Sequence, residues 1–360
     1  MNKKRIAIVA EWLTSRGGAE NVVFELARIF PDADIFSTVF NKDLFPELKG
    51  RNVITSFLQK IPILNKKHQL ALLFLPKAIE SFNFKNYDII ISSSSAFGKG
   101  IKKGKNAFHI CYCHTPMRYV WESERDNRLA RLPFGSIIKS YFKLWDLKTN
   151  KGIDKFLANS QNTARKIKKY YDIEAQVIYP PVEIEDFANS IFNNDKNKNY
   201  YFSISRFVPY KRMDIAINAC EKLNKKLYIA GSGPQDKYLR SIAGKNTVFL
   251  GRIDTDKKIK LYHNAKATIF CADEDFGIVP VESLACGTPV IAYKKGGALE
   301  IINNKTGVFF DKQSPESLIK SIRDFEKKTF DKQYLQQSVK KFDKINFKRS
   351  ILKIIENIGS

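Results

Sequence analysis

Short apolar runs that stop at polar or charged residues alternate with longer stretches whose apolar positions recur at helical spacing. Clear examples of the runs are residues 5–13, 87–95, 200–205 and 267–272. Runs of this length predict strands buried on both faces, and the stretches between them predict helices that cover those faces. The alternation therefore predicts an α/β protein with doubly wound parallel sheets, whose ligands bind beyond the carboxyl ends of the strands.

The length of the chain, 360 residues, predicts two domains, because one ordinary hydrophobic core does not grow to this size. Pro180 and Pro181 stiffen the chain, and residues 183–199 are polar and predicted to be irregular. We place the first domain at residues 1–182 and the second at residues 183–344. The apolar spacing of residues 347–358 predicts a final helix at about 345–360.

The chain is strongly basic, with 61 Lys and Arg against 37 Asp and Glu and a formal net charge of +24. Such a charge attracts nucleic acid, diphosphate ligands or anionic membranes, and it equally suits a solvated surface in a lysine-rich proteome. Lys99, Lys102, Lys103 and Lys105 share one glycine-rich loop. Residues 139–151 combine lysines with aromatic residues at helical spacing, a pattern found at membrane surfaces and in ordinary core helices.

The sequence also predicts a cellular compartment. No apolar run is long enough to span a bilayer, and the first run ends at Glu11 without a small-residue cleavage site. We therefore expect a buried first strand and not a signal peptide. The cysteines are few and lie mostly in apolar contexts, which is typical of buried reduced thiols in a cytoplasmic protein: Cys111, Cys113, Cys220, Cys271 and Cys286.

Residues 271–300 carry the richest pattern in the chain. The apolar run 267–272 stops at acids, a loop with Gly277 follows, and VPVESLAC then has helical spacing. Glu274 in the loop and Glu282 in the helix are about two turns apart, so both carboxylates can face one cleft. Carboxylates accept hydrogen bonds from sugar hydroxyls, and the free N–H groups at a helix N-terminus suit a phosphate. An amphipathic helix with surface acids is the alternative interpretation.

Residues 107–122 contain His109, Cys111, Cys113 and His114, which invites a metal-site interpretation. In a strand, residues 109, 111 and 113 project in a line and do not wrap around one ion, so we expect no metal there. His114 ends the strand, and its ring is expected to face the cleft. A buried structural imidazole is the other interpretation.

Cations and glycines follow other predicted strands. Arg206 and Lys211 come after the strand 200–205, where two cations can hold a diphosphate, although ordinary surface cations would look the same. Gly17 and Gly18 precede the first predicted helix, and Gly231 follows the strand predicted in KLYIAGSGP at 226–234. Glycines at such junctions let a ligand approach the backbone, and a plain turn explains them nearly as well.

Taken together, these segments resemble the retaining glycosyltransferases of family 4. The resemblance rests on E-x7-E with FG-x-x-x-x-E and CGTPVI around it, on GG-x-E at residues 17–20, on S-R-x-x-x-x-K at 205–211 and on G-x-G-P at 231–234. The phrase CHTPMRYVW at 113–121 resembles a subgroup that builds bacterial surface polysaccharides, often with mannose. The resemblance implies the GT-B fold, in which two Rossmann-like domains face each other across a cleft and the last helix crosses back onto the first.

The resemblance also implies roles for individual residues. Glu274, Arg206, Lys211 and His114 would be catalytic, with the two cations stabilising the charge that grows on the leaving diphosphate. Gly17 and Gly18 would form the acceptor or phosphate loop. The remaining residues would bind the donor, with Glu282 on its ribose: Glu282, Phe276, Gly277, Ile278, Arg252, Ile253 and Gly231.

By the same resemblance, the function is transfer of a sugar, favoured as mannose from GDP-mannose, to a glycan or lipid-linked glycan. We expect no required metal and no cofactor, because the basic residues and helix N-termini already supply positive charge. Peripheral contact with an anionic membrane is expected, and nucleic acid is not expected as a partner. Two alternatives are a GT-B sugar-nucleotide epimerase and a non-catalytic basic protein that binds polyanions.

Overall fold

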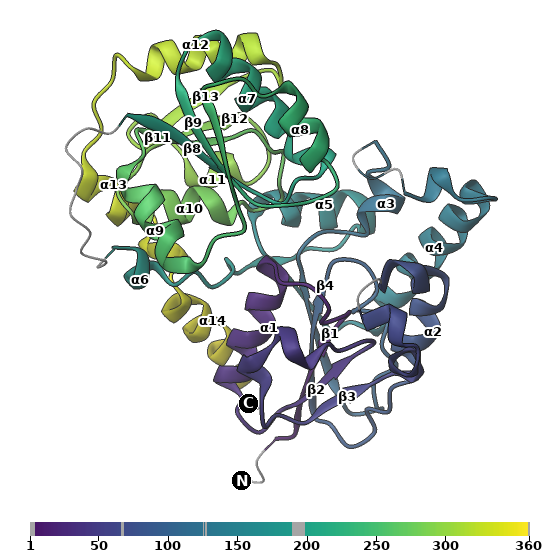
Figure 1. Cartoon of the computed structure of the whole chain (residues 1–360). Coiled ribbons are helices and arrows are strands. Elements are labelled where there is room, and N and C mark those ends of the chain that lie inside the picture. The colour runs from purple at the N-terminus through teal and green to yellow at the C-terminus, as the bar shows by residue number, and fades with distance from the viewer. Residues whose placement is uncertain (1–3, 66–67, 125, 127, 189–198, 359–360) are drawn as a thin grey trace. The chain divides into compact units, whose positions relative to one another are not determined.

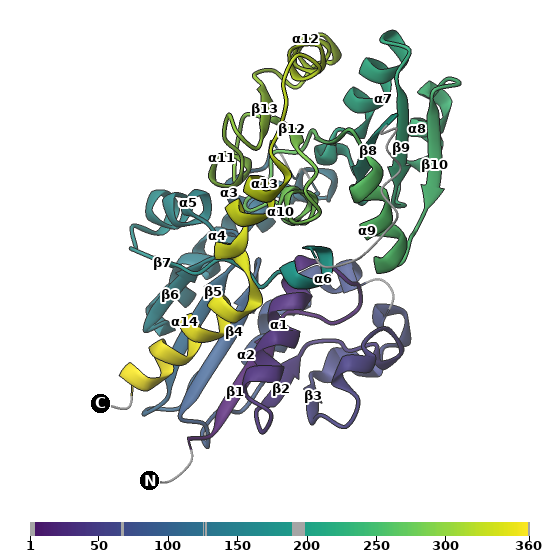
Figure 2. The same ribbon diagram turned by 90° about the vertical axis from the view of Figure 1, so that its left-hand side faces the viewer.

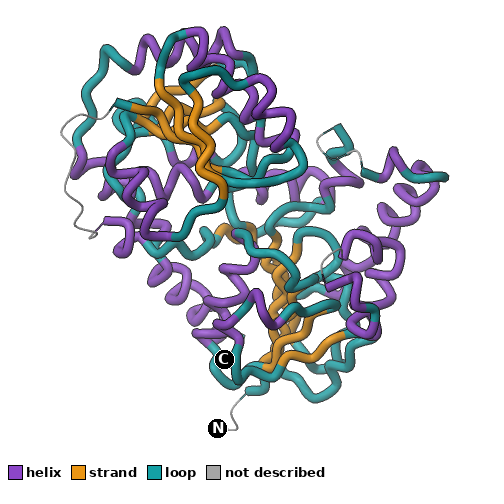
Figure 3. The backbone as a smooth tube through the Cα atoms, in the orientation of Figure 1, coloured by secondary structure: helices purple, strands orange, loops and turns teal. Residues whose placement is uncertain are grey.

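The computed structural model describes the chain except for residues 1–3, 66–67, 125, 127, 189–198 and 359–360. Its contacts divide into two compact units, Met1–Pro181 with Ile345–Ser360, and Val182–Lys344. Each unit is a parallel sheet with helices on both faces (Figures 1 and 3). The described part of the chain has no helix that is both long and apolar enough to cross a membrane.

The first unit has a seven-stranded sheet in the order β3-β2-β1-β4-β5-β6-β7. Neighbouring strands run parallel, with Ile8 opposite both Ile35 and Ile91 in the centre of the sheet. The strand at the β7 edge of this order is only two residues long. The strands are β1 (Ile6–Ala10), β2 (Asp34–Ser37), β3 (Val53–Thr55), β4 (Ile89–Ser94), β5 (Phe108–Cys113), β6 (Lys155–Ala158) and β7 (Gln176–Val177).

Two apolar clusters cover the two faces of this sheet. One face packs against α2 (Leu75–Glu80) and α4 (Gly135–Thr149), and the other packs against α1 (Gly18–Ile29) and α14 (Lys344–Asn357). Phe347, Ile351 and Ile354 of α14 are buried in the second cluster. Figures 1 and 2 show α14 beside α1. The short α3 (Arg118–Trp121) and α5 (Gln161–Tyr171) complete the unit.

The second unit has a six-stranded parallel sheet in the order β10-β9-β8-β11-β12-β13. Its strands are β8 (Tyr200–Ile204), β9 (Lys226–Ala230), β10 (Thr247–Gly251), β11 (Ala267–Phe270), β12 (Val290–Tyr293) and β13 (Gly307–Phe310). Its helices are α6 (Ile184–Ala188), α7 (Met213–Lys222), α8 (Asp236–Ile242), α9 (Thr255–Asn264), α10 (Ile278–Ala285), α11 (Ala298–Ile301), α12 (Pro315–Phe325) and α13 (Lys332–Ser338). Both sheets reverse strand order at their first strand, so the loops on either side of that strand diverge and leave room for a ligand.

The segment predicted to be irregular, 183–199, is only partly so. Residues 189–198 lie outside the described residues, but Ile184–Ala188 form α6. Ile184 and Phe187 of α6 are buried, and a ring nitrogen of His263 lies 3.1 Å from the carbonyl oxygen of Phe187. Tertiary packing therefore holds a helix that local composition does not favour.

Candidate functional site

The loops at the carboxyl ends of β8, β9 and β10 are joined by backbone hydrogen bonds. The Gly231 N–H donates to the carbonyl of Gly251 over 2.7 Å, and the Phe207 N–H donates to that of Ser232 over 2.9 Å. Gly231 has φ of +131°, and a Cβ there would lie 1.8 Å from the carbonyl oxygen of Ser205. Only glycine fits this position, so these loops form one fixed rim.

Arg252 belongs to this rim, because its Nε donates to the Ser232 hydroxyl over 2.8 Å. Arg252 is exposed and the following Ile253 is half-buried. The guanidinium is thus positioned by the glycine loop while its remaining N–H groups face solvent. This arrangement suits contact with a flat or anionic ligand group.

The loop between β11 and α10 carries the first of the two glutamates. The carboxylate of Glu274 forms an ion pair with Lys211, which follows β8, the neighbouring strand. The Gly297 N–H donates to the Glu274 carbonyl over 2.9 Å, which fixes the loop against the turn after β12. Gly277 has φ of +99° and directly precedes α10, so Phe276 and Gly277 are held where the helix N-terminus begins.

The second glutamate, Glu282, is almost fully buried on α10. Its Oε1 lies 2.7 Å from Nζ of Lys258, and its Oε2 accepts a hydrogen bond from the Tyr262 hydroxyl over 3.0 Å. Both partners lie on α9, and sequence reasoning missed both of them. Lys258 and Tyr262 are four residues apart on a helix, so their side chains lie on the same face. This spacing is the sequence signal that could have identified them as partners of one group.

The predicted cations of the second unit differ in their surroundings. Lys211 is mostly buried beside Glu274, whereas Arg206 is exposed. Arg212, the N-cap residue of α7, pairs with Asp214 over 3.0 Å. The structure therefore brings Lys211 and Glu274 together and leaves the guanidinium of Arg206 facing solvent at the same strand end.

In the first unit, His114 lies at the end of β5 as the sequence predicted. Its Nε2 is 2.8 Å from the Ser93 hydroxyl of β4, and its carbonyl accepts a hydrogen bond from Asn159 over 3.0 Å. The ring is half-buried and packs edge-on against Tyr112. Ser93 at the end of the neighbouring strand is thus a partner of this histidine.

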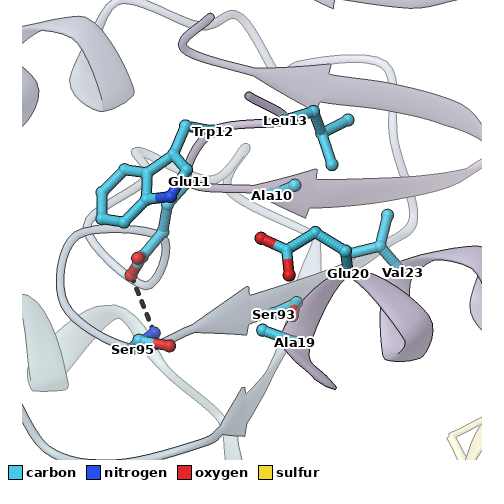
Figure 4. A pocket seen from close by; sticks show the side chains of 9 residues that line it. All are labelled: Ala10, Glu11, Trp12, Leu13, Ala19, Glu20, Val23, Ser93 and Ser95. Carbon is cyan, nitrogen blue, oxygen red and sulfur yellow. Dashed lines mark hydrogen bonds between the residues drawn. The ribbon is translucent and has the colours of Figure 1, made fainter. Parts of the chain in front are cut away.

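Ser93 also borders a small cavity of about 40 Å³ at the carboxyl ends of β1 and β4 (Figure 4). Glu11 and Glu20 line this cavity, and Figure 4 shows the Glu20 carboxylate pointing into it. Glu20 lies in the first turn of α1, next to Gly17 and Gly18. A carboxylate at this helix N-terminus competes with an anionic ligand, so the cavity suits a hydroxyl group better than a phosphate.

Glu11 was not among the predicted site residues. Its Oε1 accepts hydrogen bonds from the N–H groups of Ser95, Ala96 and Gly98, with lengths of 2.8 Å to Ser95 and 3.0 Å to Gly98. Burial raises the pKa of the Glu11 carboxyl, and these hydrogen bonds partly offset that effect. The sequence signal that could have identified Glu11 as a site residue is its place as an acid directly after a buried strand.

The basic loop around residue 99 does not form a free patch. Lys99 is buried with its Nζ 3.0 Å from Oδ1 of Asp146, while Lys102 pairs with Glu80 over 2.9 Å and Lys103 pairs with Asp154. Lys105 is exposed. Three of the four lysines are therefore neutralised within the fold.

The cysteine and histidine side chains on β5 are buried within the fold. All five cysteines are buried free thiols, and Nε2 of His109 lies 2.8 Å from the Ser92 hydroxyl. Within the ranges that the structure describes, no group of three His, Cys, Asp or Glu side chains could hold a metal ion.

Comparison with known proteins identifies the family. A model described as "Glycosyltransferase Family 4" matches residues 16–186, and one described as "Glycosyl transferases group 1" matches residues 184–342. The chain belongs to glycosyltransferase family 4. Its relatives include human alpha-1,3/1,6-mannosyltransferase ALG2, 26% identical over 71% of this chain and 67% of that protein. An uncharacterised glycosyltransferase of Methanocaldococcus jannaschii is 34% identical over 37% of each chain, so the match spans about a third of that protein's length.

Solved structures of this family's fold align with nearly the whole chain. Anabaena HepE in complex with UDP has a TM-score of 0.72 at 17% identity and covers 98% of this chain and 100% of its own. Sucrose-phosphate synthase from Thermosynechococcus elongatus has a TM-score of 0.71 at 16% identity and covers 99% of both chains. With the two parallel sheets described above, these neighbours show the GT-B fold.

Proposed function

We propose that this family 4 glycosyltransferase moves a mannosyl group from GDP-mannose to a hydroxyl of a glycan or lipid-linked glycan, with retention of anomeric configuration. The observation that carries the proposal is the Lys211–Glu274 pair, which joins two neighbouring strand ends beside a fixed glycine rim. A cation for a diphosphate and an acceptor for sugar hydroxyls are then in direct contact, as a sugar diphosphate requires.

In the proposed donor complex, the diphosphate adds negative charge near Lys211. Lys211 then shares its three N–H donors between the phosphate and Glu274, which leaves lone pairs of Glu274 for sugar hydroxyls. Arg206, exposed at the same strand end, adds a bidentate donor. The N–H groups of Phe276 and Gly277 at the start of α10 contribute further positive potential, with Ile278 as the first residue of the helix.

The proposed reaction is a same-face displacement. The bond from the anomeric carbon to the diphosphate oxygen breaks, the acceptor oxygen bonds to that carbon from the same side, and the acceptor proton passes to the departing phosphate. Arg206 and Lys211 stabilise the charge that grows on the phosphate, which is the electrostatic part of the catalysis. These cations are why we expect the reaction to proceed without a metal ion.

The donor is the finer part of the proposal. The ALG2 relatives, which are about 26% identical to this chain, are named mannosyltransferases, and this supports mannose as the sugar. One structural neighbour was instead solved with UDP-glucose. Glu282 would accept hydrogen bonds from the ribose, and Arg252 and Ile253 would lie against the base. Ribose and diphosphate are common to both donors, so base and sugar need a direct test.

On the acceptor side, the cavity beside Ser93 and Glu20 supports binding of a hydroxyl, and His114 would contact the donor sugar. The net charge of +24 supports peripheral contact with an anionic membrane that carries a lipid-linked acceptor, at the cytoplasmic face.

A thermal-shift panel tests the donor with GDP-mannose, UDP-glucose, UDP-GlcNAc, GDP and UDP, each with and without EDTA. A ligand that binds the folded state raises the Tm by mass action. Shifts confined to guanine nucleotides and indifferent to EDTA support the proposal. Tm shifts with uridine nucleotides alone would exclude GDP-mannose as the donor but would still support the proposed donor site. Tm shifts that EDTA abolishes would exclude metal-free binding of the donor.

Product analysis separates the rival activities. An epimerase converts the sugar nucleotide without an acceptor, whereas the proposed enzyme releases GDP only as glycan is extended. A polyanion-binding protein would show no nucleotide shift, and its binding would fall steeply with salt.

A further inference from the structure

Helix α4 exposes apolar side chains on the face that does not pack on the sheet. Its Phe142 and Trp145 are buried in the core, as expected for a covering helix. The opposite face carries Ile137, Tyr141 and Leu144 at spacings of four and three, with exposed fractions of 66%, 52% and 71%. A helix at a protein–water boundary normally turns polar residues outward, so this row needs a partner.

A second exposed apolar group lies next to α4. It comes from three 3-10 helices, Phe57–Lys60, Pro62–Asn65 and His68–Phe74, which lead into α2. The inward residues of this segment share the core cluster of Phe142 and Trp145, and Nε1 of Trp145 donates to Glu80 at the end of α2 over 2.7 Å. Its outward apolar residues are Phe57, Ile61, Ile63, Leu70, Leu73 and Phe74. Figure 1 shows α4 next to α2.

The charged residues around this apolar surface indicate which kind of partner it binds. The sequence has no Asp or Glu between Glu47 and Glu80, or between Asp126 and Asp146. Glu80 is paired with Lys102, and Asp146 is buried with Lys99. The exposed charged residues beside the apolar side chains are lysines, among them Lys60, Lys77, Lys143 and Lys148.

We propose that α4 and the segment 57–74, apart from residues outside the structure's described range, form a docking surface for an anionic lipid bilayer. Apolar and aromatic side chains would enter the headgroup boundary while the lysines meet lipid phosphates. A second copy of the chain fits less well, because it would place like charges opposite each other. The inference deepens the membrane contact proposed above and does not depend on the identity of the donor.

Vesicle co-sedimentation tests the surface. One set of vesicles contains phosphatidylcholine alone. The other contains phosphatidylcholine and phosphatidylglycerol at a molar ratio of 7:3. We expect the wild-type protein to pellet with the anionic vesicles and release as salt rises. Ile137→Gln with Leu144→Gln should lower the partition coefficient at least about tenfold, and Leu70→Gln with Leu73→Gln should lower it similarly. Glutamine keeps helix propensity, so both pairs should fold.

Val248→Gln with Ile345→Gln is the matched control, since these exposed apolar residues lie on β10 and at the start of α14, and it should bind vesicles as the wild type does. The GDP-mannose thermal shift measures the donor site separately in the same proteins. Equal pelleting by the Ile137/Leu144 variant and the wild type would overturn the surface, as would wild-type pelleting no better with anionic than with neutral vesicles. A wild-type dimer that these substitutions dissociate would also overturn it. If GDP-mannose gave no Tm shift while vesicle binding was intact, the proposed donor would be excluded and the docking surface would stand.

Discussion

Nζ of Lys258 lies 2.7 Å from Oε1 of Glu282, and the two residues belong to consecutive helices, α9 and α10. The Tyr262 hydroxyl holds the other carboxylate oxygen at 3.0 Å. Both carboxylate oxygens of Glu282 are therefore positioned before a donor arrives. A carboxylate with both oxygens already positioned loses little conformational freedom on binding, which favours affinity.

Glu282→Ala should weaken GDP-mannose binding by about 10- to 100-fold, because the ribose loses a charged hydrogen-bond acceptor. Calorimetric titration measures the Kd directly. Glu316→Ala is the control, as that exposed acid pairs with Lys222 and should leave the Kd unchanged. Equal affinities for the Glu282 variant and the wild type would remove its assigned contact.

Arg206→Ala and Glu274→Ala should each lower kcat by about 10²- to 10³-fold while the circular dichroism spectrum stays native, because their interactions strengthen as the phosphate departs. Lys222→Ala removes an exposed lysine on α7 and serves as the control. Turnover near that of the wild type in either variant would exclude that residue from the mechanism.

Stability should fall in acid partly through His109, which is fully buried. Burial lowers the pKa of its imidazole to about 4, below the ordinary value of 6.5. Between these two values the unfolded state binds more protons than the folded state, so the free energy of unfolding falls as pH falls. From pH 7.5 to pH 5 this residue should cost about 2 kcal/mol.

Urea unfolding of wild type and His109→Gln at the two pH values isolates this contribution. The variant should lose less stability on acidification, since glutamine does not titrate. Parallel losses in the two proteins would show that His109 carries none of the acid sensitivity.

The buried pair of Lys99 and Asp146 should dominate the stability of the α4 region. Asp146 also accepts hydrogen bonds from Trp121 over 2.7 Å and Tyr171 over 2.8 Å. Lys99→Met leaves the carboxylate buried without its cation and should destabilise the protein by about 3 to 5 kcal/mol. The double change Lys99→Met/Asp146→Asn should recover part of that loss, as measured by urea unfolding. No recovery would mean that lost packing, and not charge, causes the effect.

The sequence alone determined the parallel α/β class and the family. Apolar runs ending at polar residues predicted the buried strands, because a parallel sheet covered on both faces requires them. The segments around Glu274, Arg206 and His114 predicted family 4, because such local strings keep their spacing whatever surrounds them. The roles of Glu274 and Arg206 remain predictions that the variants above address, and the role of His114 also remains a prediction.

Tertiary structure decided which groups meet. Residue order does not show that Glu11 binds the N–H groups of the loop 95–98, or that Lys258 neutralises Glu282. Nor does it separate the buried Lys99 from the exposed Lys105 in one basic loop. Periodicity reports that a helix has an apolar face, but α4 has two, and only packing decides which one the sheet covers. Pairing and burial depend on segments far apart in the chain, so they appear only once the sheets have formed.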